Sequence, residues 1–546
     1  MNESNILIEK NQKANTHIIL NNTQTNVKIN KSNIFKKQSR DKYIIFAIRI
    51  IIFIILYSLI IIKFKDNLKR KKRKNIIKKI NRNSVYKIDE IYKNIESYEI
   101  KHNKMECNAL DPINIFKKRL TSTSTILCSN DDSNHICFKD GNDLFVARNG
   151  ASCEFKNVII DPSKWRADNN IYKGPMDPNN RGCPLLSEGF FNIQCKSGEK
   201  NNYSGYDFIY NNYFNGWNYE YKNYEKEKEQ LEELAPGKTV FFISRNQDSP
   251  NLYHGGSEFV NALAIMYLMN LNPKDIQIVF LESILIMDDP FYDLYKELIG
   301  RGGEPIHIKN LTKKYLVSKG VHIPINWDSP CFIRSEVPEC INHPTKTYYL
   351  YNMLIDKYIS PDNYTDIISN NNNNKNNSEI FYYPETIINE IAKNKNSFNK
   401  ILTFQWRRVW PKGRKGQYRI LGNGPELADK LSSLLPKNIL LRLIDTARLP
   451  IKQQISIMRN TDYFVGIHGA GLSLSIFAPQ NCIYHEVLHV PNMNGLELFA
   501  ALSGHKVYKD IIAANVKYID GNENIFFNVD EFAKVVISHL KESNLM

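Results

Sequence analysis

The chain has 546 residues, of which 42% are apolar and 24% charged, and its formal net charge at pH 7 is +15. Residues 1–100 contain 22 Lys and Arg against 8 Asp and Glu, so the positive excess lies in the N-terminal fifth and the rest is nearly neutral. A nucleic-acid-binding domain carries its basic face on the globular part, so this distribution argues against that class. The near-neutral remainder is long enough for two or three ordinary domains.

An apolar segment, Tyr43–Ile62, is interrupted only by Arg49 and Ser58. As a helix it is long enough to cross a hydrocarbon core of about 30 Å, so the sequence predicts a single-pass membrane anchor. A cleavable signal peptide fits less well, because 42 residues precede the segment and no small-residue cleavage site follows it. Residues 1–42 are then a cytosolic tail, and the basic, Asn-rich residues 63–105 a stem.

The sequence contains conflicting signals about the side of the membrane on which the C-terminal part lies. The basic run 69–74 follows the anchor, and the positive-inside rule alone would place that part in the cytosol. Against this, clustered cysteines and Asn-x-Ser/Thr sequons favour an oxidising, lumenal compartment. The residues are Cys107, Cys128, Cys137, Cys153, Cys183 and Cys195, with sequons at Asn202, Asn310, Asn363 and Asn376. We expect a lumenal C-terminal part; a cytosolic enzyme on a membrane surface, with reduced cysteines, is the alternative.

Beyond the stem, composition divides the chain into three parts. Residues 106–235 contain the cysteine cluster with many Asn, Gly, Pro and Tyr, and we expect a loop-rich region packed on the first core domain. Strands alternate with helices over 236–399 and again over 400–546, which is typical of parallel β/α units. The Asn-rich, low-complexity insertion at 361–378 marks a boundary between two Rossmann-like domains.

Hydrophobic patterning gives the expected elements of both series. In the first, strands are predicted at 238–244 and 276–282 and helices at 219–234, 256–270 and 290–299. In the second, strands are predicted at 400–406, 438–444, 462–467, 482–488 and 505–509, and helices at 424–435, at 450–460, from 469, at 494–503 and at 529–542. The fold class is therefore α/β, with a ligand cleft expected at the carboxyl ends of the strands.

The most informative stretch lies between residues 462 and 486, where a strand is followed by His468, Gly469, Ala470 and Gly471. Small residues at a helix start let a ligand approach the backbone, whose free N–H groups attract an anion such as a diphosphate. His468 is a candidate donor to a phosphate, and Glu486 a candidate acceptor for ribose hydroxyls. The alternative is a tight βα turn with close helix packing. An α/β-hydrolase or dinucleotide fold lacks support, because no Gly-x-Ser-x-Gly elbow is present and no Gly-x-Gly-x-x-Gly follows a predicted strand.

The His-Gly-Ala-Gly block, with the Phe, Pro and Glu that follow it, resembles glycosyltransferase family 61. Further matching residues are Phe477, Pro479, Glu486, Arg407, Arg408, Gln454 and the Arg-x-x-x-Asn element Arg419–Asn423. Upstream, Asn251–Glu258 resembles an Asn-x-Tyr-His…Asp stretch of one branch of the family, with Glu258 in place of Asp. The resemblance covers about residues 236–510. It departs from the family's pattern at Ser473 and Ser475 and in the Asn-rich insertion.

This resemblance implies a GT-B-like fold of two Rossmann-like domains facing a cleft, a nucleotide-sugar donor, and inversion at the anomeric carbon without an essential metal or other cofactor. The sequence agrees, since it contains no Asp-x-Asp between strands, and the leaving diphosphate then needs helix N–H groups and arginines. Arg408, Arg419 and His468 are the candidates. Alternatively, Arg407 and Arg408 are surface charges and His468 bonds to a buried carbonyl.

An inverting transfer also needs a general base for the acceptor hydroxyl on the opposite side of the cleft. His254 and Glu258 lie four residues apart at a helix start, so they share one face, and either or both could be the base. An ordinary helix-surface pair is the alternative, and Asp328 is a further candidate.

The combined hypothesis is a membrane-anchored, inverting glycosyltransferase of the Golgi or ER membrane in the type II orientation. It would move N-acetylglucosamine or a pentose from a UDP-sugar to a hydroxyl of a glycoprotein or polysaccharide, with no nucleic acid as partner. The alternative is a catalytically inactive, membrane-anchored binding protein on the same fold, and donor hydrolysis would separate the two.

Overall fold

The computed structural model describes residues 88–546 apart from several segments, the longest at 139–151, 168–183, 197–215, 324–339, 360–380 and 388–397. The expected tail (1–42), anchor (43–62) and most of the stem lie outside the described residues, as do Cys183, Asn202, Asp328 and the insertion 361–378. Within the described part, no helix is long and apolar enough to cross a membrane. The expected α/β class is confirmed, because several sheets alternate with helices.

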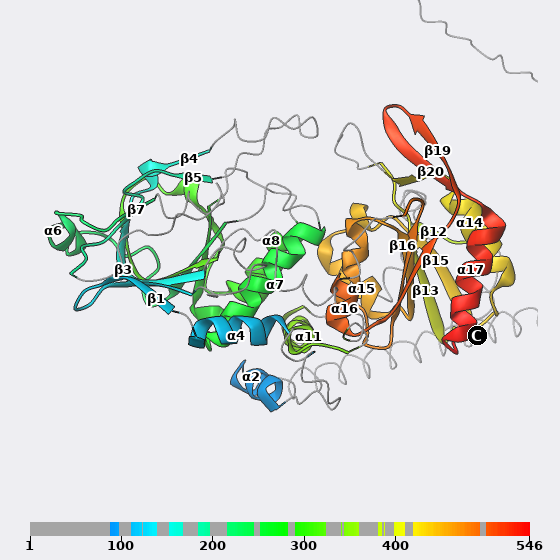
Figure 1. Ribbon diagram of the computed structural model, residues 1–546, viewed down its shortest axis with the longest axis horizontal. Helices are drawn as coiled ribbons and strands as arrows, with labels where there is room; N and C mark the ends of the chain where they lie inside the picture. The colour runs from blue at the N-terminus through cyan, green and yellow to red at the C-terminus, as the bar shows by residue number, and fades with distance from the viewer. Residues whose placement is uncertain are drawn as a thin grey trace, which may run out of the picture. The chain divides into compact units, whose positions relative to one another are not determined.

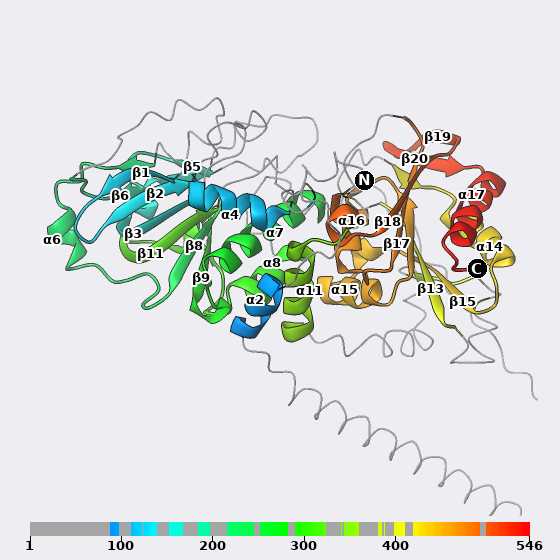
Figure 2. The ribbon, with the colours of Figure 1, turned by 60° about the horizontal axis from the view of Figure 1, so that its bottom comes forward.

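The first sheet combines parallel and antiparallel strands. Its order is β1-β2-β3-β11-β8-β9-β10, with β6 beside β3 and β7 beside β6. Figure 2 shows β3, β11, β8 and β9 side by side in this order. The bounds are β1 Ser124–Ser129, β2 Asn134–Phe138, β3 Ser152–Ile160, β6 Phe191–Asn192, β7 Trp217–Asn218, β8 Thr239–Ile243, β9 Ile276–Phe280, β10 Ile306–His307 and β11 Tyr315–Ile323. Strands β8 to β11 are mutually parallel, whereas β1, β2 and β3 are antiparallel. Thus the region expected to be loop-rich supplies strands to this sheet, because its segments are rich in β-branched and aromatic residues.

The second sheet has the order β12-β15-β13-β16-β17-β18, and all its strands except β12 are parallel. The bounds are β12 Phe381–Tyr382, β13 Lys400–Gln405, β15 Ile439–Ile444, β16 Tyr463–Ile467, β17 Ile483–Leu488 and β18 Lys506–Ile511. Numbered along the chain, the five parallel strands follow the order 2-1-3-4-5. The order reverses between β13 and β16, and ligands of such sheets bind at that switch point.

Two smaller sheets complete the strands. The hairpin of β19 (Ala514–Ile519) and β20 (Asn522–Phe527) pairs with β14 (Ile420–Leu421), and β4 (Trp165–Ala167) pairs with β5 (Pro184–Leu186). Asp520 and Gly521 both have positive φ, which is the conformation of a two-residue hairpin turn. The hairpin was not among the expected elements.

Helices cover both faces of the second sheet. Figure 1 shows α14 and α17 on one face and α15 and α16 on the other. The bounds are α14 Gly424–Leu434, α15 Ile451–Arg459, α16 Leu498–Ser503 and α17 Val529–Glu542, with the 3₁₀ helix η8 at Ala470–Phe477. Alternate strand residues divide accordingly: Leu402 and Phe404 pack in the core with α14 and α17, whereas Phe464 and Tyr484 pack with α15, η8 and α16.

The remaining helices belong to the part of the chain before β12. They are α2 Ile88–Ser97, α4 Pro112–Ser122, α6 Tyr224–Lys228, α7 Leu252–Leu268, α8 Pro290–Leu294 with a π-helical turn Tyr295–Ile299, and α11 Lys346–Tyr358. Short 3₁₀ turns lie at Pro162–Lys164, Pro273–Asp275, Ile308–Asn310 and Thr446–Arg448. Residues 88–97, within the expected stem, form an amphipathic helix whose Tyr92 hydroxyl donates to the Leu271 carbonyl at 2.7 Å. This part of the stem is therefore packed on the core.

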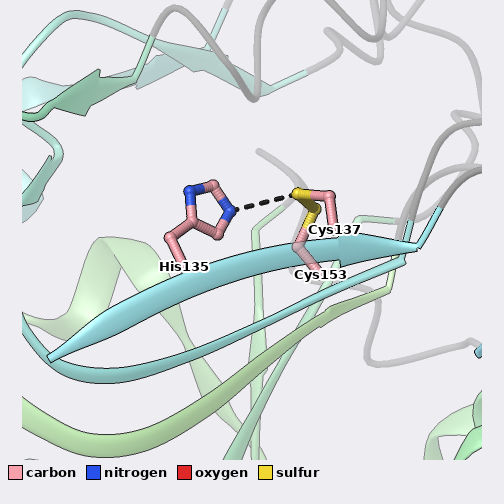
Figure 3. Close-up of side chains that lie close together, drawn as sticks. All are labelled: His135, Cys137 and Cys153. Atoms are coloured by element: carbon pink, nitrogen blue, oxygen red, sulfur yellow. Dashed lines mark hydrogen bonds between the residues drawn. A yellow bond between two sulfur atoms is a disulfide. The ribbon is translucent and has the colours of Figure 1, made fainter. Parts of the chain in front are cut away.

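Three disulfides connect cysteines of the described residues: Cys107–Cys340, Cys128–Cys195 and Cys137–Cys153. The last joins directly paired residues of β2 and β3, and the imidazole of His135 lies beside it (Figure 3). Five of the six cysteines in the expected cluster are thus oxidised, while Cys482 is buried as a free thiol.

The Cys107–Cys340 bond is reinforced by hydrogen bonds next to it. Asp111 is buried, and its carboxylate accepts from the Thr347 hydroxyl at 2.9 Å and from the Lys346 backbone N–H at the start of α11. A carboxylate there satisfies an N–H of the first helical turn and favours the positive end of the helix dipole. Cys107 is therefore held covalently to Cys340, and Asp111 is held by hydrogen bonds to the start of α11.

Candidate donor-binding site

The second sheet brings the sequence motifs together at its switch point. Arg407 lies two residues beyond β13, His468 directly follows β16, and Glu486 lies near the end of β17. Gln405, Gly466 and Glu486 are paired across the three strands, so they share one face of the sheet. The middle residue has no side chain, which lets η8 pack closely on β16: a Cβ on Gly466 would lie 2.9 Å from Cδ2 of Leu472 and 3.0 Å from Cβ of Gln405.

His468 and Glu486 form a buried pair. The Nδ1 of His468 hydrogen-bonds to Oε1 of Glu486, and the backbone N–H of His468 donates to the Val487 carbonyl at 3.0 Å. Since an ionised carboxylate only accepts, Nδ1 carries the proton, and Nε2 becomes a second donor when the ring is charged. Glu486 is fully buried, so in this structure it orients the imidazole, whereas the sequence had suggested contact with ribose. Its second oxygen, Oε2, has no hydrogen-bond partner among the described residues.

The two glycines of the motif make room for two side chains at the carboxyl end of β13, Gln405 and Arg407. A Cβ on Gly469 would lie 1.6 Å from Nη1 of Arg407, and one on Gly471 would lie 1.6 Å from Nε2 of Gln405. Gly469 itself is extended, so close approach and not a left-handed φ requires glycine here. After it, Ala470 and Gly471 are half-buried and begin η8, a 3₁₀ helix where we expected an α-helix.

A second arginine approaches from the β14 side. Burial and the neighbouring charge of Arg419 together lower the pKa of Arg407 to about 10, against the attraction of Glu523. Burial also lowers the pKa of Arg419, against the attraction of Glu523 and Glu486. Arg419 has a left-handed φ of 62°, and its backbone N–H donates to Oε2 of Glu523 at 3.1 Å. Two arginines held this close favour an anionic ligand that would relieve their repulsion.

The remaining members of the cluster come from the end of the chain. Glu523 lies on the β19–β20 hairpin, and its Oε1 is 3.6 Å from Nε2 of His489. Burial lowers the pKa of His489, and Arg419 and His468 act in the same direction. We refer to Arg407, Arg419, His468, Glu486, His489 and Glu523 as the switch-point cluster. Sequence reasoning missed Glu523 and His489, because no motif marks them.

Arg408 has different surroundings from Arg407. Its guanidinium lies over the ring of Trp406, 4.6 Å from the centroid, and its charge acts on Asp445 after β15. Arg407, not Arg408, contacts the motif glycine. The sequence contained a signal for this choice, because side chains along a strand alternate between its two faces. Thr403 and Gln405 lie on the face that η8 covers, and residue 407 is the next one at the same two-residue spacing.

The two candidate bases lie on α7. Glu258 is buried, with 1% of its surface exposed, so it is not part of an ordinary surface pair. His254 belongs to the same helix, but its side chain lies outside the described residues. The face of α7 with Leu252, Gly256 and Val260 packs against η8, so the start of this helix adjoins the helix of the glycine motif.

Asn423, in the Arg-x-x-x-Asn element, has a structural role. Its amide donates to the Phe527 carbonyl at 2.9 Å and its oxygen accepts from the Phe527 N–H at 3.3 Å. This pairing holds the start of α14 against β20. The element therefore brings Arg419 to the cluster at one end and fixes the hairpin at the other.

A parallel sheet in the 2-1-3-4-5 order, with arginines and a glycine turn at its switch point, defines an α/β protein with a candidate anion-binding site. The family model of Glycosyltransferase 61 matches residues 332–484, which include β13, β16 and η8. The EGF domain-specific O-linked N-acetylglucosamine transferase of Drosophila melanogaster is 25% identical over 272 residues, 49% of this chain and 44% of that protein. The match thus spans less than half of either chain. Both matches support assignment to glycosyltransferase family 61, and the resemblance indicated by the motifs is confirmed.

Proposed function

We propose that this protein is an inverting glycosyltransferase that transfers a sugar from a UDP-sugar to a hydroxyl group without an essential metal. The observation that carries the proposal is the switch-point cluster, in which Arg407, Arg419 and His468 converge beside the glycine turn. The family match to this part of the chain supports it. The diphosphate of the donor would lie against these three side chains and the backbone N–H groups at the start of η8.

The transfer would proceed in one displacement. A base removes the proton of the acceptor hydroxyl, its oxygen attacks the anomeric carbon, and the bond to the diphosphate breaks with inversion. Charge then develops on the leaving UDP, where the two arginines and His468 would stabilise it. Glu486 orients the imidazole. Glu258 and His254, on the helix that packs against η8, are the proposed bases.

The substrates are proposed from the name of the relative. That protein is a transferase of O-linked N-acetylglucosamine specific for EGF domains. We therefore place UDP-N-acetylglucosamine first among donors, with a UDP-pentose as the alternative, and a hydroxyl of a glycoprotein before a polysaccharide as acceptor.

A lumenal location in the Golgi or ER, a type II anchor at residues 43–62 and a GT-B arrangement of two Rossmann-like domains belong to the same proposal. Three disulfides support an oxidising compartment. Asn310 is exposed at the end of the short 3₁₀ turn Ile308–Asn310, so its sequon is accessible for glycosylation. Treating the protein and its Asn310→Gln variant with a glycosidase, and comparing their masses on a gel, would test this location.

The decisive experiment measures UDP release by the full-length protein in detergent with a panel of UDP-sugars, with and without acceptor. We expect release with one donor and strong loss in His468→Ala and Arg419→Ala. Tight UDP binding without release from any donor would favour the alternative, an inactive binding protein. Release of UDP at the wild-type rate by both variants would contradict the assigned site.

A further inference from the structure

A second polar cluster lies on the opposite face of the second sheet. It consists of His485 on β17, Asp510 on β18 and His539 on α17. Since His485 directly precedes Glu486 in an extended strand, their side chains point to opposite faces. The three side chains therefore meet between α17 and the sheet, away from the switch-point cluster.

The three side chains direct their ligand atoms at one point. Nε2 of His485 lies 2.9 Å and Nε2 of His539 lies 2.7 Å from the same oxygen, Oδ2 of Asp510. All three atoms are within 4.8 Å of one another. Nε2 of His485 is fully buried, yet it has no well-oriented hydrogen bond to any described group. Hydrogen bonding alone therefore leaves this nitrogen unsatisfied, whereas a cation between the three atoms would satisfy it.

The outer contacts of both imidazoles suit metal ligands. Nδ1 of His485 is 2.8 Å from the Tyr463 hydroxyl, which can accept its proton and leave Nε2 as a bare ligand. The His539 ring stacks on Tyr508, with centroids 3.8 Å apart, and its Nδ1 is 3.6 Å from a carboxylate oxygen of Glu542. Groups on the far nitrogen fix the orientation of a metal-bound histidine.

A second group, His135, Cys137 and Cys153, also brings three possible ligand atoms together. It has no thiolate to offer, because its two sulfurs are bonded to each other (Figure 3).

We propose that His485, Asp510 and His539 bind a zinc ion that joins α17 to the β17–β18 edge of the sheet. Two imidazoles and one carboxylate are a common donor set for Zn²⁺. Asp510 and His539 are partly exposed, with 30% and 17% of their side-chain surface accessible, so water can occupy a fourth position. The ion holds the last helix in place and takes no part in transfer, and the inference does not rest on the proposed function.

The test uses the full-length protein in detergent, stripped with EDTA and titrated with ZnCl₂ while metal content and thermal unfolding are measured. We expect one zinc per chain and a higher unfolding temperature. Outer-shell substitutions cost about 10- to 100-fold in metal affinity, so Asp510→Asn and His539→Gln should weaken binding by at least about 100-fold. His307→Asn is the matched control, since Asn can replace the histidine that caps a 3₁₀ turn in the first sheet.

Failure of the stripped protein to take up zinc would overturn the inference, as would a zinc affinity equal to that of the wild-type protein in both ligand variants. Should the variants fail to fold, Co²⁺ added to the stripped wild-type protein provides a direct readout. A tetrahedral nitrogen- and oxygen-ligated Co²⁺ gives an intense visible absorption band that ZnCl₂ then displaces. An unchanged cobalt spectrum relative to buffer would contradict the site.

Discussion

His485 and Glu486 are neighbours in one strand, yet the two faces of the sheet give them different tasks. On the face of Glu486, glycines remove side chains so that arginines and His468 can converge at the edge of the sheet. On the face of His485, large rings fill the space and the polar atoms are directed at one another beneath a helix. The comparison teaches that small residues on one face make room for the charged side chains of the proposed donor site, whereas polar groups on the other face meet between the sheet and a helix.

The largest effect is expected from Arg407→Ala, compared with Arg408→Ala. Removing a group that stabilises charge on the leaving diphosphate costs about 10²- to 10³-fold in kcat. Arg408 lies over Trp406 and does not contact the motif glycine, so its loss should cost far less. Steady-state kinetics with the preferred donor measures both. A larger loss in Arg408→Ala would reverse the assignment.

Gly469→Ala comes next. The added methyl group would overlap the Arg407 guanidinium, which must then move by more than an ångström. Misplacement on that scale costs about 10²-fold in kcat/KM. The double variant Arg407→Ala/Gly469→Ala should be no worse than Arg407→Ala alone, because both changes act through one side chain. Additive losses in the double variant would show that the glycine acts otherwise.

A paired comparison within β17 separates the two faces directly. Glu486→Gln removes the carboxylate that orients His468, so we expect kcat to fall at least about 10-fold with a near-normal unfolding temperature. His485→Gln, one residue away, should lower the unfolding temperature while leaving kcat within about two-fold, because it acts on α17 and not on the donor. If each variant changed kcat and the unfolding temperature to a similar extent, the two faces would not be independent.

The smallest effect concerns pH. Because burial lowers the pKa of His485, the unfolded chain binds more protons as the pH falls below the ordinary imidazole value of about 6.5. The free energy of unfolding should therefore decrease from pH 7 to pH 5, measured in EDTA by denaturant titration. His485→Gln should show a shallower decrease. An equally steep decrease in that variant would assign the effect to other buried histidines.

Much of the second series could be predicted from the sequence, because its buried parallel strands are short apolar runs bounded by helices. Strands expected at 400–406, 438–444 and 482–488 differ from β13, β15 and β17 by one residue at an end. The β19–β20 hairpin was missed although its Asp520-Gly521 turn is a strong hairpin signal. Because the hairpin was missed, Glu523 was missed as well, since this hairpin supplies Glu523 to the switch-point cluster.

The site was predictable where one short segment contains it and not where separate segments meet. His468, Gly469 and Glu486 follow from a single motif. Arg407 and Arg408 are the same residue type, so the sequence does not distinguish them by chemistry. The choice depends on which of the two lies on the face of β13 that η8 covers. The approach of Arg419 and Glu523, 104 residues apart, is set by β14–β20 pairing, for which the sequence contains no local signal.

The Cys107–Cys340 bond has a consequence for proteolysis. It spans 233 positions, so a single cut anywhere between these cysteines would leave two fragments joined by sulfur. On a gel without reductant such a nicked chain would migrate as one species, and adding dithiothreitol would release the N-terminal piece. A protease that removed the residues before 107 would likewise leave every disulfide of the described chain intact.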